Sequence, residues 1–285
     1  MKKFLKYFAL TTAGIIVILA VLIAYAHFVE PFRLVIKEQT LSVKHWSREL
    51  NGFRVVAVSD IHGGSRPVTE ERLQYLTEQV NAQNPDIIVL LGDFVSQTGG
   101  RSSALKMPIE TIAQNIRGMK AKYGVYVAIG NHDWWYDEQK VRAEFEKVGF
   151  TVLENETASF EVNGQTMTIL GIEDFWKRRK VEVNEILAKI EPQKNIIGIT
   201  HNPDSFDQTP ASVALLLAGH THGGQVLIPF YGAPLTVSQR KYYTHPYYVE
   251  NGRSLFVTSG FGTTGPPFRF LVPPEIAVLD IYAAD

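Results

Sequence analysis

The sequence predicts an α/β fold, a layered sandwich in which β-sheets are covered by helices, preceded by an apolar N-terminal segment. Two observations predict it. Short apolar runs rich in β-branched residues recur from residue 53 onward, and polar segments with helical spacing separate the early runs. Toward the C-terminus the strand-like segments follow one another without helices, which indicates a second half that is richer in β-structure.

The first element is an apolar stretch, Tyr7 to Val29, that contains no Asp, Glu, Lys or Arg. A helix needs roughly 20 apolar residues to cross a bilayer, so residues 1–30 are predicted to be a transmembrane anchor. A cleaved signal peptide is the alternative, because Ala24 to Ala26 form an A-x-A pattern behind an apolar core. The uncleaved anchor is favoured, since signal-peptide cores run only about 7 to 15 residues.

Lysines precede the apolar stretch at positions 2, 3 and 6. By the positive-inside rule they place the N-terminus in the cytoplasm and the rest of the chain outside. Arg33, Lys37 and Lys44 on the other flank weaken this bias, so a cytoplasmic main domain stays open. The sequence thus predicts a single-pass membrane protein with an extracytoplasmic domain.

Residues 31–50 are predicted to be a linker and a strand that leads into the main domain, residues 51–285, because Leu34 to Val43 alternates in polarity. Buried strands are expected in FRVVAVS, DIIVLLG, GVYVAIG, NIIGIT and SVALLLAG. Further strands are expected in GGQVLIPF, SLFVTSG and EIAVLDIY, and a hairpin at Asn163-Gly164. Helices are expected after Thr69 as N-cap, and from Asp137 to a C-cap at Gly149.

Composition excludes several classes of protein. The 285 residues are 45% hydrophobic, which is enough for a globular core. A formal charge of −1 disfavours a protein that coats nucleic acid or acidic lipid. There are no cysteines, so disulfides and thiolate metal sites are excluded and His, Asp, Glu or Asn must hold any metal.

Each of the five apolar runs ends in side chains that bind metals. In chain order these are Asp60 and His62, Asp93, Asn131 and His132, His201, and His220 and His222. Open α/β sheets bind ligands beyond the carboxyl ends of their strands, so these scattered ends are expected to converge. In an extended segment alternate residues point the same way, so Asp60 with His62, and His220 with His222, can aim at one centre. Glycines at 92, 130, 219, 223 and 224 are expected to permit tight turns and close backbone approach.

The donor set combines oxygen and nitrogen without sulfur. Apart from His132 it offers seven donors, too many for one structural zinc, which usually takes four ligands. Two metals that share a bridging ligand fit better, and Asp93 is the expected bridge. A water held between two such ions loses a proton near neutral pH and becomes a hydroxide nucleophile.

These blocks, in this order, resemble the signature of the calcineurin-like metallophosphoesterases. The resemblance covers roughly Phe53 to Tyr282. The segments SDIHGG, THNPD, GHTHGGQ and GFGTTGPPFRF are similar to the bacterial branch with an N-terminal membrane segment. The resemblance implies a four-layer sandwich, two mixed β-sheets flanked by α-helices, with residues 51–285 as the catalytic domain.

The resemblance also implies the roles of the site residues. One divalent ion would be held by Asp60, His62, Asp93 and His222, and a second by Asp93, Asn131, His201 and His220. His132 would protonate the leaving oxygen or stabilise the phosphoryl charge. The donors suit Mn, Fe, Zn and Co alike, so the metals are not identified.

The chain departs from the family pattern at one position. In the GD-x-x-D block, Ser96 stands where a second Asp is common. In relatives that Asp supports a histidine from behind the site, so its replacement puts the positioning of that histidine in doubt more than metal binding itself. The arginine that follows this block in protein Ser/Thr phosphatases is also absent, so protein dephosphorylation is disfavoured.

Other residues are candidates outside these blocks. Arg269, in the glycine-rich tail, is a candidate phosphate ligand, and Trp134 to Tyr136 a candidate substrate wall on a loop. The KRRK run at 177–180 could meet headgroups or a diphosphate, although a solvated face is the commoner role of such a run. His27, His45 and His245 are expected to be structural.

The sequence therefore predicts a membrane-anchored, dinuclear-metal phosphoesterase that cleaves a phosphodiester, phosphomonoester or diphosphate bond. A lipid-linked substrate is expected because tethering concentrates the site at the bilayer. Some family members cleave UDP-2,3-diacylglucosamine in lipid A synthesis, but that substrate is made on the cytoplasmic side, against the charge rule. The alternatives are a non-catalytic membrane scaffold that keeps the metal shell and a nuclease; no nucleic-acid partner is expected, and oligomeric state is not predicted.

Overall fold

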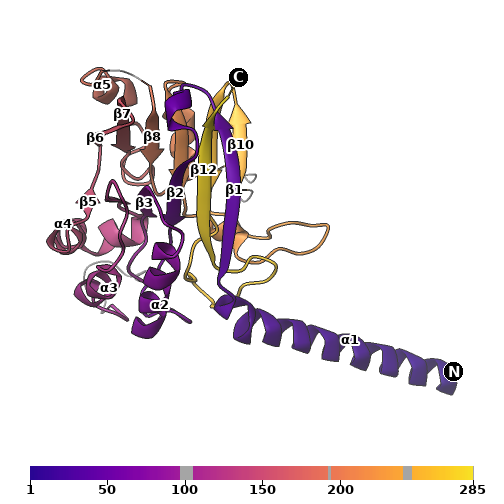
Figure 1. Ribbon diagram of the computed structural model, residues 1–285. Helices are drawn as coiled ribbons and strands as arrows, with labels where there is room; N and C mark the ends of the chain where they lie inside the picture. The colour runs from indigo at the N-terminus through magenta and orange to yellow at the C-terminus, as the bar shows by residue number, and fades with distance from the viewer. Residues whose placement is uncertain (97–104, 192–193, 240–245, 285) are drawn as a thin grey trace.

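The computed structural model describes residues 1–96, 105–191, 194–239 and 246–284, and it contains two six-stranded β-sheets (Figure 1). The first sheet has the strand order β1 (Val35–Val43), β12 (Glu275–Ala283), β2 (Phe53–Val58), β3 (Ile87–Leu91), β4 (Val125–Ala128) and β5 (Thr151–Val152). β12 is antiparallel to β2 and the other pairs are parallel, so the sheet is mixed.

The second sheet is also mixed. Its order is β10 (Tyr247–Glu250), β11 (Arg253–Val257), β9 (Val213–Ala218), β8 (Ile196–Ile199), β7 (Gln165–Gly171) and β6 (Glu156–Val162). The two outer pairs are antiparallel and the inner ones parallel. The strands β2, β3 and β4 of the first sheet and β8 and β9 of the second end at the edge that carries the polar blocks, whereas β1 and β12 run in the opposite direction.

Alternate residues of the buried strands face two different cores. Val55 and Ala57 of β2 lie in the core between the sheets, together with residues of β8 and β9. Val56 and Val58 face α2 (Glu70–Asn81), α3 (Ile109–Ile116) and α4 (Asn131–Lys147). The outer face of the second sheet packs against α5 (Val183–Leu187) and the short helix η3 (Pro203–Gln208). The predicted arrangement of two mixed sheets flanked by helices is therefore confirmed.

Helix α1 (Lys2–Phe28) extends away from the sheets (Figure 1). Among the described residues it forms the one segment long and apolar enough to cross a bilayer, Lys2–Phe32, with a mean hydropathy of 2.5 in its best window. The short helices η1 (Glu30–Phe32) and η2 (Arg48–Leu50) flank β1, and η4 (His222–Gly224) follows β9.

Several predicted boundaries are confirmed. Thr69 caps α2 by accepting a hydrogen bond from Arg72 N, and the hairpin turns at Asn163 and Gly164 with positive φ at both. Two predictions are wrong. The strand expected in GGQVLIPF is absent, because Pro229 lacks an N–H and Ile228 pairs back onto Gly232 to form a turn. The aromatic residues 134–136 lie on a helical turn that begins at Asn131 and not on a loop. The helix expected from Asp137 is confirmed, because α4 is kinked at Asp137, whose backbone is non-helical and whose carboxylate accepts from Lys140 N at 3.2 Å.

Candidate functional site

Metal-binding side chains follow β2, β3 and β4 of the first sheet and β8 and β9 of the second, where each strand ends. All of the predicted site residues in these blocks are buried. Seven of them form three overlapping groups whose ligand atoms lie within 4.8 Å of one another: Asp60, His62 and His222; His62, Asp93 and His132; Asp93, His201 and His220. Asn131, the eighth, directly precedes His132 at the start of α4. Residues up to 162 positions apart in the chain are thus brought to one place.

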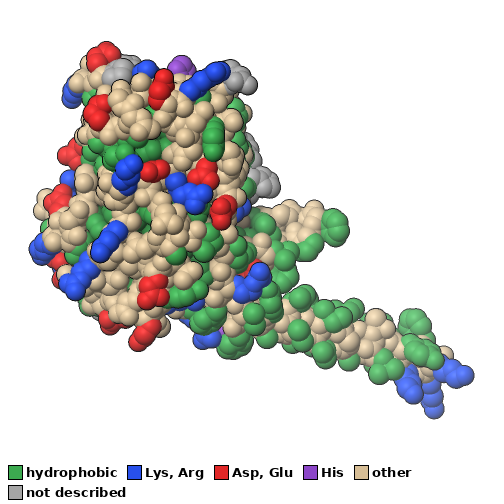
Figure 2. Space-filling view, viewed as in Figure 1, with side chains coloured by type: hydrophobic (Ala, Val, Ile, Leu, Met, Phe, Trp, Pro, Cys, Tyr) green, Lys and Arg blue, Asp and Glu red, His purple; other side chains and the backbone are tan. Residues whose placement is uncertain are grey.

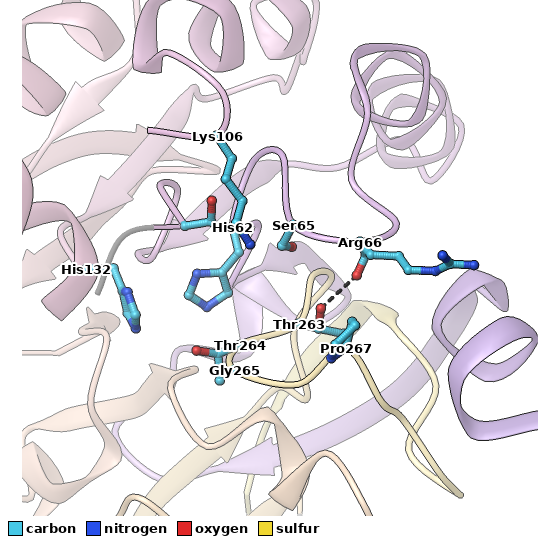
Figure 3. A pocket seen from close by; sticks show the side chains of 10 residues that line it. His62, Ser65, Arg66, Lys106, His132, Thr263, Thr264, Gly265 and Pro267 are labelled. Carbon is cyan, nitrogen blue, oxygen red and sulfur yellow. Dashed lines mark hydrogen bonds between the residues drawn. The ribbon is translucent and has the colours of Figure 1, made fainter. Parts of the chain in front are cut away.

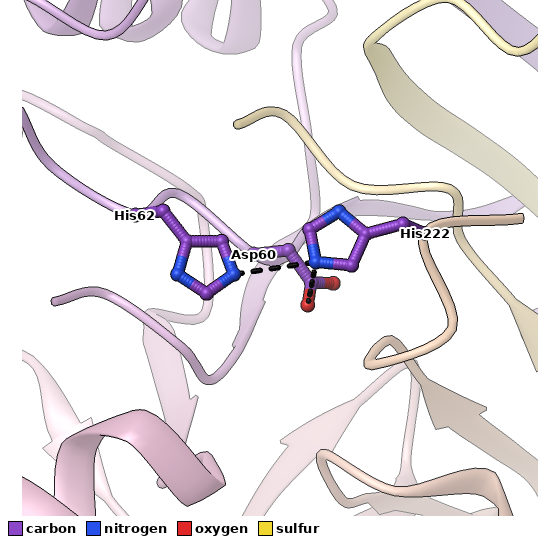
Figure 4. A group of neighbouring side chains, drawn as sticks. All are labelled: Asp60, His62 and His222. Atoms are coloured by element: carbon purple, nitrogen blue, oxygen red, sulfur yellow. Dashed lines mark hydrogen bonds and ion pairs between the residues drawn. The ribbon is translucent and has the colours of Figure 1, made fainter. Parts of the chain in front are cut away.

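The first group gathers three donor atoms around one point (Figure 4). The Nε2 atoms of His62 and His222 are 3.2 Å apart, and Asp60 Oδ1 is 3.3 Å from His222 Nε2. Ligand atoms about 2.0 to 2.2 Å from one cation lie at roughly such separations from each other. The group therefore has the spacing of donors around a single ion.

The group formed by Asp93, His201 and His220 has the same spacing. His201 Nε2 lies 3.1 Å from Asp93 Oδ2 and 3.1 Å from His220 Nδ1. Asp93 Oδ2 also lies 3.7 Å from His62 Nε2, which belongs to the first group. One carboxylate oxygen thus faces both groups, as a bridging ligand must.

Several buried polar atoms at the site have no hydrogen-bond partner among the described residues: Asp60 Oδ1, Asn131 Oδ1, His220 Nε2 and His222 Nδ1. A buried polar atom without a partner costs about 1 to 3 kcal/mol, so such atoms are rare unless something else occupies their lone pairs. A cation would occupy the lone pairs of Asp60 Oδ1 and Asn131 Oδ1. The donor set of carboxylate, amide and imidazole fits divalent metal ions.

The protonation states agree with that fit. Burial lowers the pKa of His62 to about 3 and lowers the pKa values of His220 and His222 well below the usual range, so these rings are neutral, the form that binds metals. Burial also opposes charge on His201, but Asp93 outweighs it and raises the pKa of His201 to about 10. A metal ion would displace that proton.

Backbone carbonyls orient the rings. His62 Nδ1 lies 3.1 Å from Val95 O and His201 Nδ1 lies 2.7 Å from Leu91 O. A carbonyl can only accept, so Nδ1 carries the proton and Nε2 presents its lone pair to the site. Ser96, the departure from the family pattern, donates from Oγ to the backbone carbonyl of Gly63 at 2.9 Å.

The backbone is left-handed at most of the candidate ligands. Asp60, His62, Asp93, His220 and His222 have φ between 46° and 68°. This conformation is uncommon outside glycine, and such strain gathers at functional sites. It also corrects one expectation, because Asp60 with His62, and His220 with His222, converge through left-handed turns and not through extended alternation. Gly130 makes the close approach that was expected, since a Cβ there would overlap Asp93.

Asp133, which the motif contains but to which the sequence assigns no role, organises the turns around the site. Its carboxylate accepts four backbone N–H groups, from Asp93, Phe94, Val95 and Gly130, at 2.8 to 3.1 Å. It is fully buried. Asp133 thereby joins the turn after β3 to the start of α4, and its position in GNHD was the available signal.

A pocket of about 250 Å³ opens over the site (Figure 3). His132 lines it, with Nε2 3.8 Å from Asp93 Oδ2 and its backbone N donating to Asp93 Oδ1 at 2.8 Å. Lys106 enters from the loop before α3 with its ammonium directed toward His62. Residues 263–267 of the tail line the opposite side. Lys106 belongs to no recognised motif, so nothing in the sequence indicated that it lies at the pocket.

The predicted substrate wall is corrected. Trp134 packs against the core beneath the helices and its Nε1 donates to Asp174 at 3.3 Å. Its neighbour Trp135 instead contacts His132, with ring centroids 5.1 Å apart, and stacks on Trp176. Trp176 in turn lies edge-on to His220 at 4.5 Å. The aromatic side chains beside the candidate ligands are therefore Trp135 and Trp176, because the helical turn that begins at Asn131 directs Trp134 inward.

Arg269 also differs from its predicted role. Its side chain is fully buried, and its guanidinium donates to the carbonyls of Ser259, Gly260, Gly262 and Val272 at 2.7 to 3.2 Å. The guanidinium N–H groups that were expected to bind a phosphate donate to backbone carbonyls instead. Arg269 therefore holds the tail loop together and does not bind substrate through its guanidinium.

The remaining candidates lie outside the pocket. The basic run is largely paired, since Lys177 contacts Glu138 at 2.6 Å and Glu173 at 2.8 Å, and Arg178 contacts Glu173. His27 packs against Phe268, the backbone carbonyl of His45 accepts from Asn195 N, and the pocket lining includes neither residue. His245 lies outside the described residues.

Comparisons with known proteins agree with this geometry. The family model described as calcineurin-like phosphoesterase matches residues 53–224. An uncharacterized metallophosphoesterase, YkuE, of Bacillus subtilis is 29% identical over 260 residues, covering 90% of this chain and 88% of that protein. A transmembrane protein with metallophosphoesterase domain of Danio rerio is 30% identical over 282 residues, covering 92% of this chain and 60% of that protein. An uncharacterized metallophosphoesterase of Helicobacter pylori is 27% identical, and the chain spans 63% of its length.

Proposed function

The chain belongs to the calcineurin-like phosphoesterase family, and on that premise we propose that it is a membrane-anchored enzyme that hydrolyses a phosphate ester of a lipid-linked substrate. Membership makes the chain a metal-dependent phosphoric ester hydrolase. The ligand assignment, the membrane attachment and the substrate are the proposal.

One observation carries the metal centre: two groups of buried donors, each with the spacing of ligands around one ion, face the same oxygen, Asp93 Oδ2. Asp60, His62, Asp93 and His222 would hold one divalent ion, and Asp93, Asn131, His201 and His220 the other. Two bound ions would supply positive charge for the phosphoryl oxygens and an activated water as nucleophile.

His132 and Lys106 supply the remaining chemistry from the chain itself. His132 points into the pocket beside both groups, where its ring can donate a proton to the departing oxygen. Lys106 places an ammonium at the pocket wall, where it can pair with a non-bridging phosphoryl oxygen or a second phosphate. These positions suit a monoester, a diester or a diphosphate.

A lipid-linked substrate is favoured by the position of the pocket relative to α1. The pocket is lined by Arg66 and Pro267. The Arg66 guanidinium lies 5.1 Å from the ring of Phe28, the last residue of α1, and the next residue after Pro267, Phe268, packs on His27. With α1 in a bilayer, the opening lies near the headgroup layer, where a lipid phosphate is presented.

The side of the membrane decides between lipid substrates. The lysines at positions 2, 3 and 6 favour an extracytoplasmic domain, whereas UDP-2,3-diacylglucosamine requires a cytoplasmic one. A C-terminal fusion reporter tests this. A cytoplasmic signal overturns the exterior placement, and an exterior signal overturns the nucleotide-sugar lipid as substrate.

Metal analysis of the full-length chain in detergent, followed by assays on phosphomonoesters, phosphodiesters and nucleotide-sugar lipids, tests the enzyme as a whole. We expect two divalent ions per chain and turnover that Asp93→Ala abolishes, while Asp207→Ala, at an exposed position on η3, leaves both unchanged. Two bound ions without turnover of any ester would favour the scaffold, and salt-sensitive cleavage of DNA would favour the nuclease.

A further inference from the structure

An apolar loop, residues 228–237, projects from the domain on the same side as α1 (Figure 1). Its sequence, IPFYGAPLTV, contains no charged residue. Its large apolar side chains are exposed, Phe230 fully and the others by 44 to 80%: Ile228, Tyr231, Leu235 and Val237. Soluble surfaces rarely expose such a contiguous group unless it contacts a partner or a membrane. Figure 2 shows hydrophobic side chains at the projecting tip, as it does along α1.

The apolar loop is joined to the end of α1 through one strip of the tail. Leu227 N donates to Phe270 O at 2.9 Å, and Phe270 N donates to Gln225 O at 3.0 Å, so Phe270 pairs with the base of the loop. The ring of Phe270 lies edge-on to that of Tyr25 in α1, with centroids 6.3 Å apart. The adjacent Arg269 N donates to Ala26 O at 2.9 Å. The loop base and the helix end are therefore held at a common level.

The end of α1 has the composition of a membrane interface. Tyr25, Phe28 and Phe32 gather there with Arg33 and Arg66, and aromatic and basic side chains are typical of the headgroup region. With α1 in a bilayer, a loop that projects from this level on the same side as α1 faces that bilayer.

We propose that the apolar loop inserts into the surface of the bilayer that α1 spans, as a second membrane contact of the domain. The inference rests on the proposed membrane anchoring of α1. Two contacts restrict rotation about α1 and hold the pocket, whose wall at 263–267 precedes Phe270, at the headgroup layer. The loop begins six residues after the metal-ligand candidate His222, and Gly223, Gly224 and Gln225 on the connecting segment all have positive φ.

The chain contains no cysteine, so a single introduced cysteine can be labelled uniquely. We would reconstitute the full chain in phospholipid nanodiscs with an environment-sensitive fluorophore at Phe230→Cys or Leu235→Cys. Leu19→Cys, within α1, reports the anchor. Tyr282→Cys is the aqueous control, because Tyr282 pairs with Ser42 at the end of β1 that is roughly 20 Å from α1.

We expect spin-labelled lipid to quench the fluorophore at 230, 235 and 19 but not at 282. Quenching at 19 without quenching at 230 and 235 overturns the inference, and so does a loop label that is shielded from water yet unquenched, since that indicates a protein partner. An unquenched label at 19 overturns the membrane anchor itself. The two failures are therefore distinguishable.

Activity supplies a second readout. Phe230→Asp with Leu235→Asp is expected to lower kcat/KM for a bilayer-embedded phosphodiester on the order of tenfold, because interfacial binding scales with buried apolar area. Turnover of a soluble aryl phosphodiester should be unchanged. Equal activity of the variant and the original chain on both substrates would overturn the inference.

Discussion

The carboxylate of Asp133 accepts the backbone N–H of Asp93 at 2.8 Å, and so fixes the turn that carries the candidate bridging ligand. Asp133→Asn keeps the shape but faces N–H groups with an amide that can donate, which leaves at least one of them without an acceptor. We expect metal affinity and kcat/KM to fall by about 10- to 100-fold with the fold retained. Isothermal titration calorimetry with the metal ion checks this. A metal affinity of Asp133→Asn equal to that of the original chain would contradict the role assigned to Asp133.

His132 lies within reach of both donor groups, so its role as proton donor has to be separated from metal binding. His132→Gln is expected to lower kcat by about 10²- to 10⁴-fold while two ions remain bound. The drop should be smaller for a diester with a good leaving group, which needs no proton. Loss of one ion together with activity would instead make His132 a ligand.

Lys106 directs its ammonium into the pocket, and an ion pair with substrate phosphate would act on binding. Lys106→Gln is expected to raise KM for a phosphodiester roughly tenfold with little change in kcat, and Lys106→Arg to restore part of the loss. Steady-state kinetics at two salt concentrations measure this. An unchanged KM would exclude contact between Lys106 and substrate.

Glu154 gives the stability a dependence on pH that is separate from the metal site. Burial, and then a hydrogen bond with Glu138, raise the pKa of Glu154 from 4.5 to about 8. The folded state holds the Glu154 proton more tightly than the unfolded state does. The contribution of Glu154 to the free energy of unfolding is therefore fully present below pH 4.5 and is lost as the pH rises through about 8.

Glu154→Gln is therefore expected to remove this pH dependence of the free energy of unfolding between pH 4.5 and about 8. The slope that is lost is on the order of 1 kcal/mol per pH unit. Denaturant unfolding across that range measures it, with Glu161→Gln, at an exposed position on β6, as the control. Parallel curves for Glu154→Gln and the original chain would contradict the shift.

Much of the fold was predictable because its signals are local. Apolar β-branched runs such as FRVVAV specify strands buried on both faces, and Thr69 and Gly149 mark helix ends through their own backbone chemistry. The polar blocks at the strand ends likewise predicted where donors gather, because parallel strands end at one edge. The structure brings those residues together.

Other features were not local, and only the tertiary structure decided them. Whether Arg269 meets substrate or the backbone depends on the path of the tail around residues 259–272. Trp134 turns inward because a separate helical turn begins at Asn131, ahead of the helix that starts at Asp137, where Asp133 accepts the N–H of Gly130. Lys106 reaches the pocket from a loop without a motif, and the base of the apolar loop is linked to the end of α1 because Phe270 pairs with Leu227 and packs on Tyr25. Sequence determines the chemistry of each residue, but the free energy of burial and pairing across distant segments determines which partner that chemistry meets.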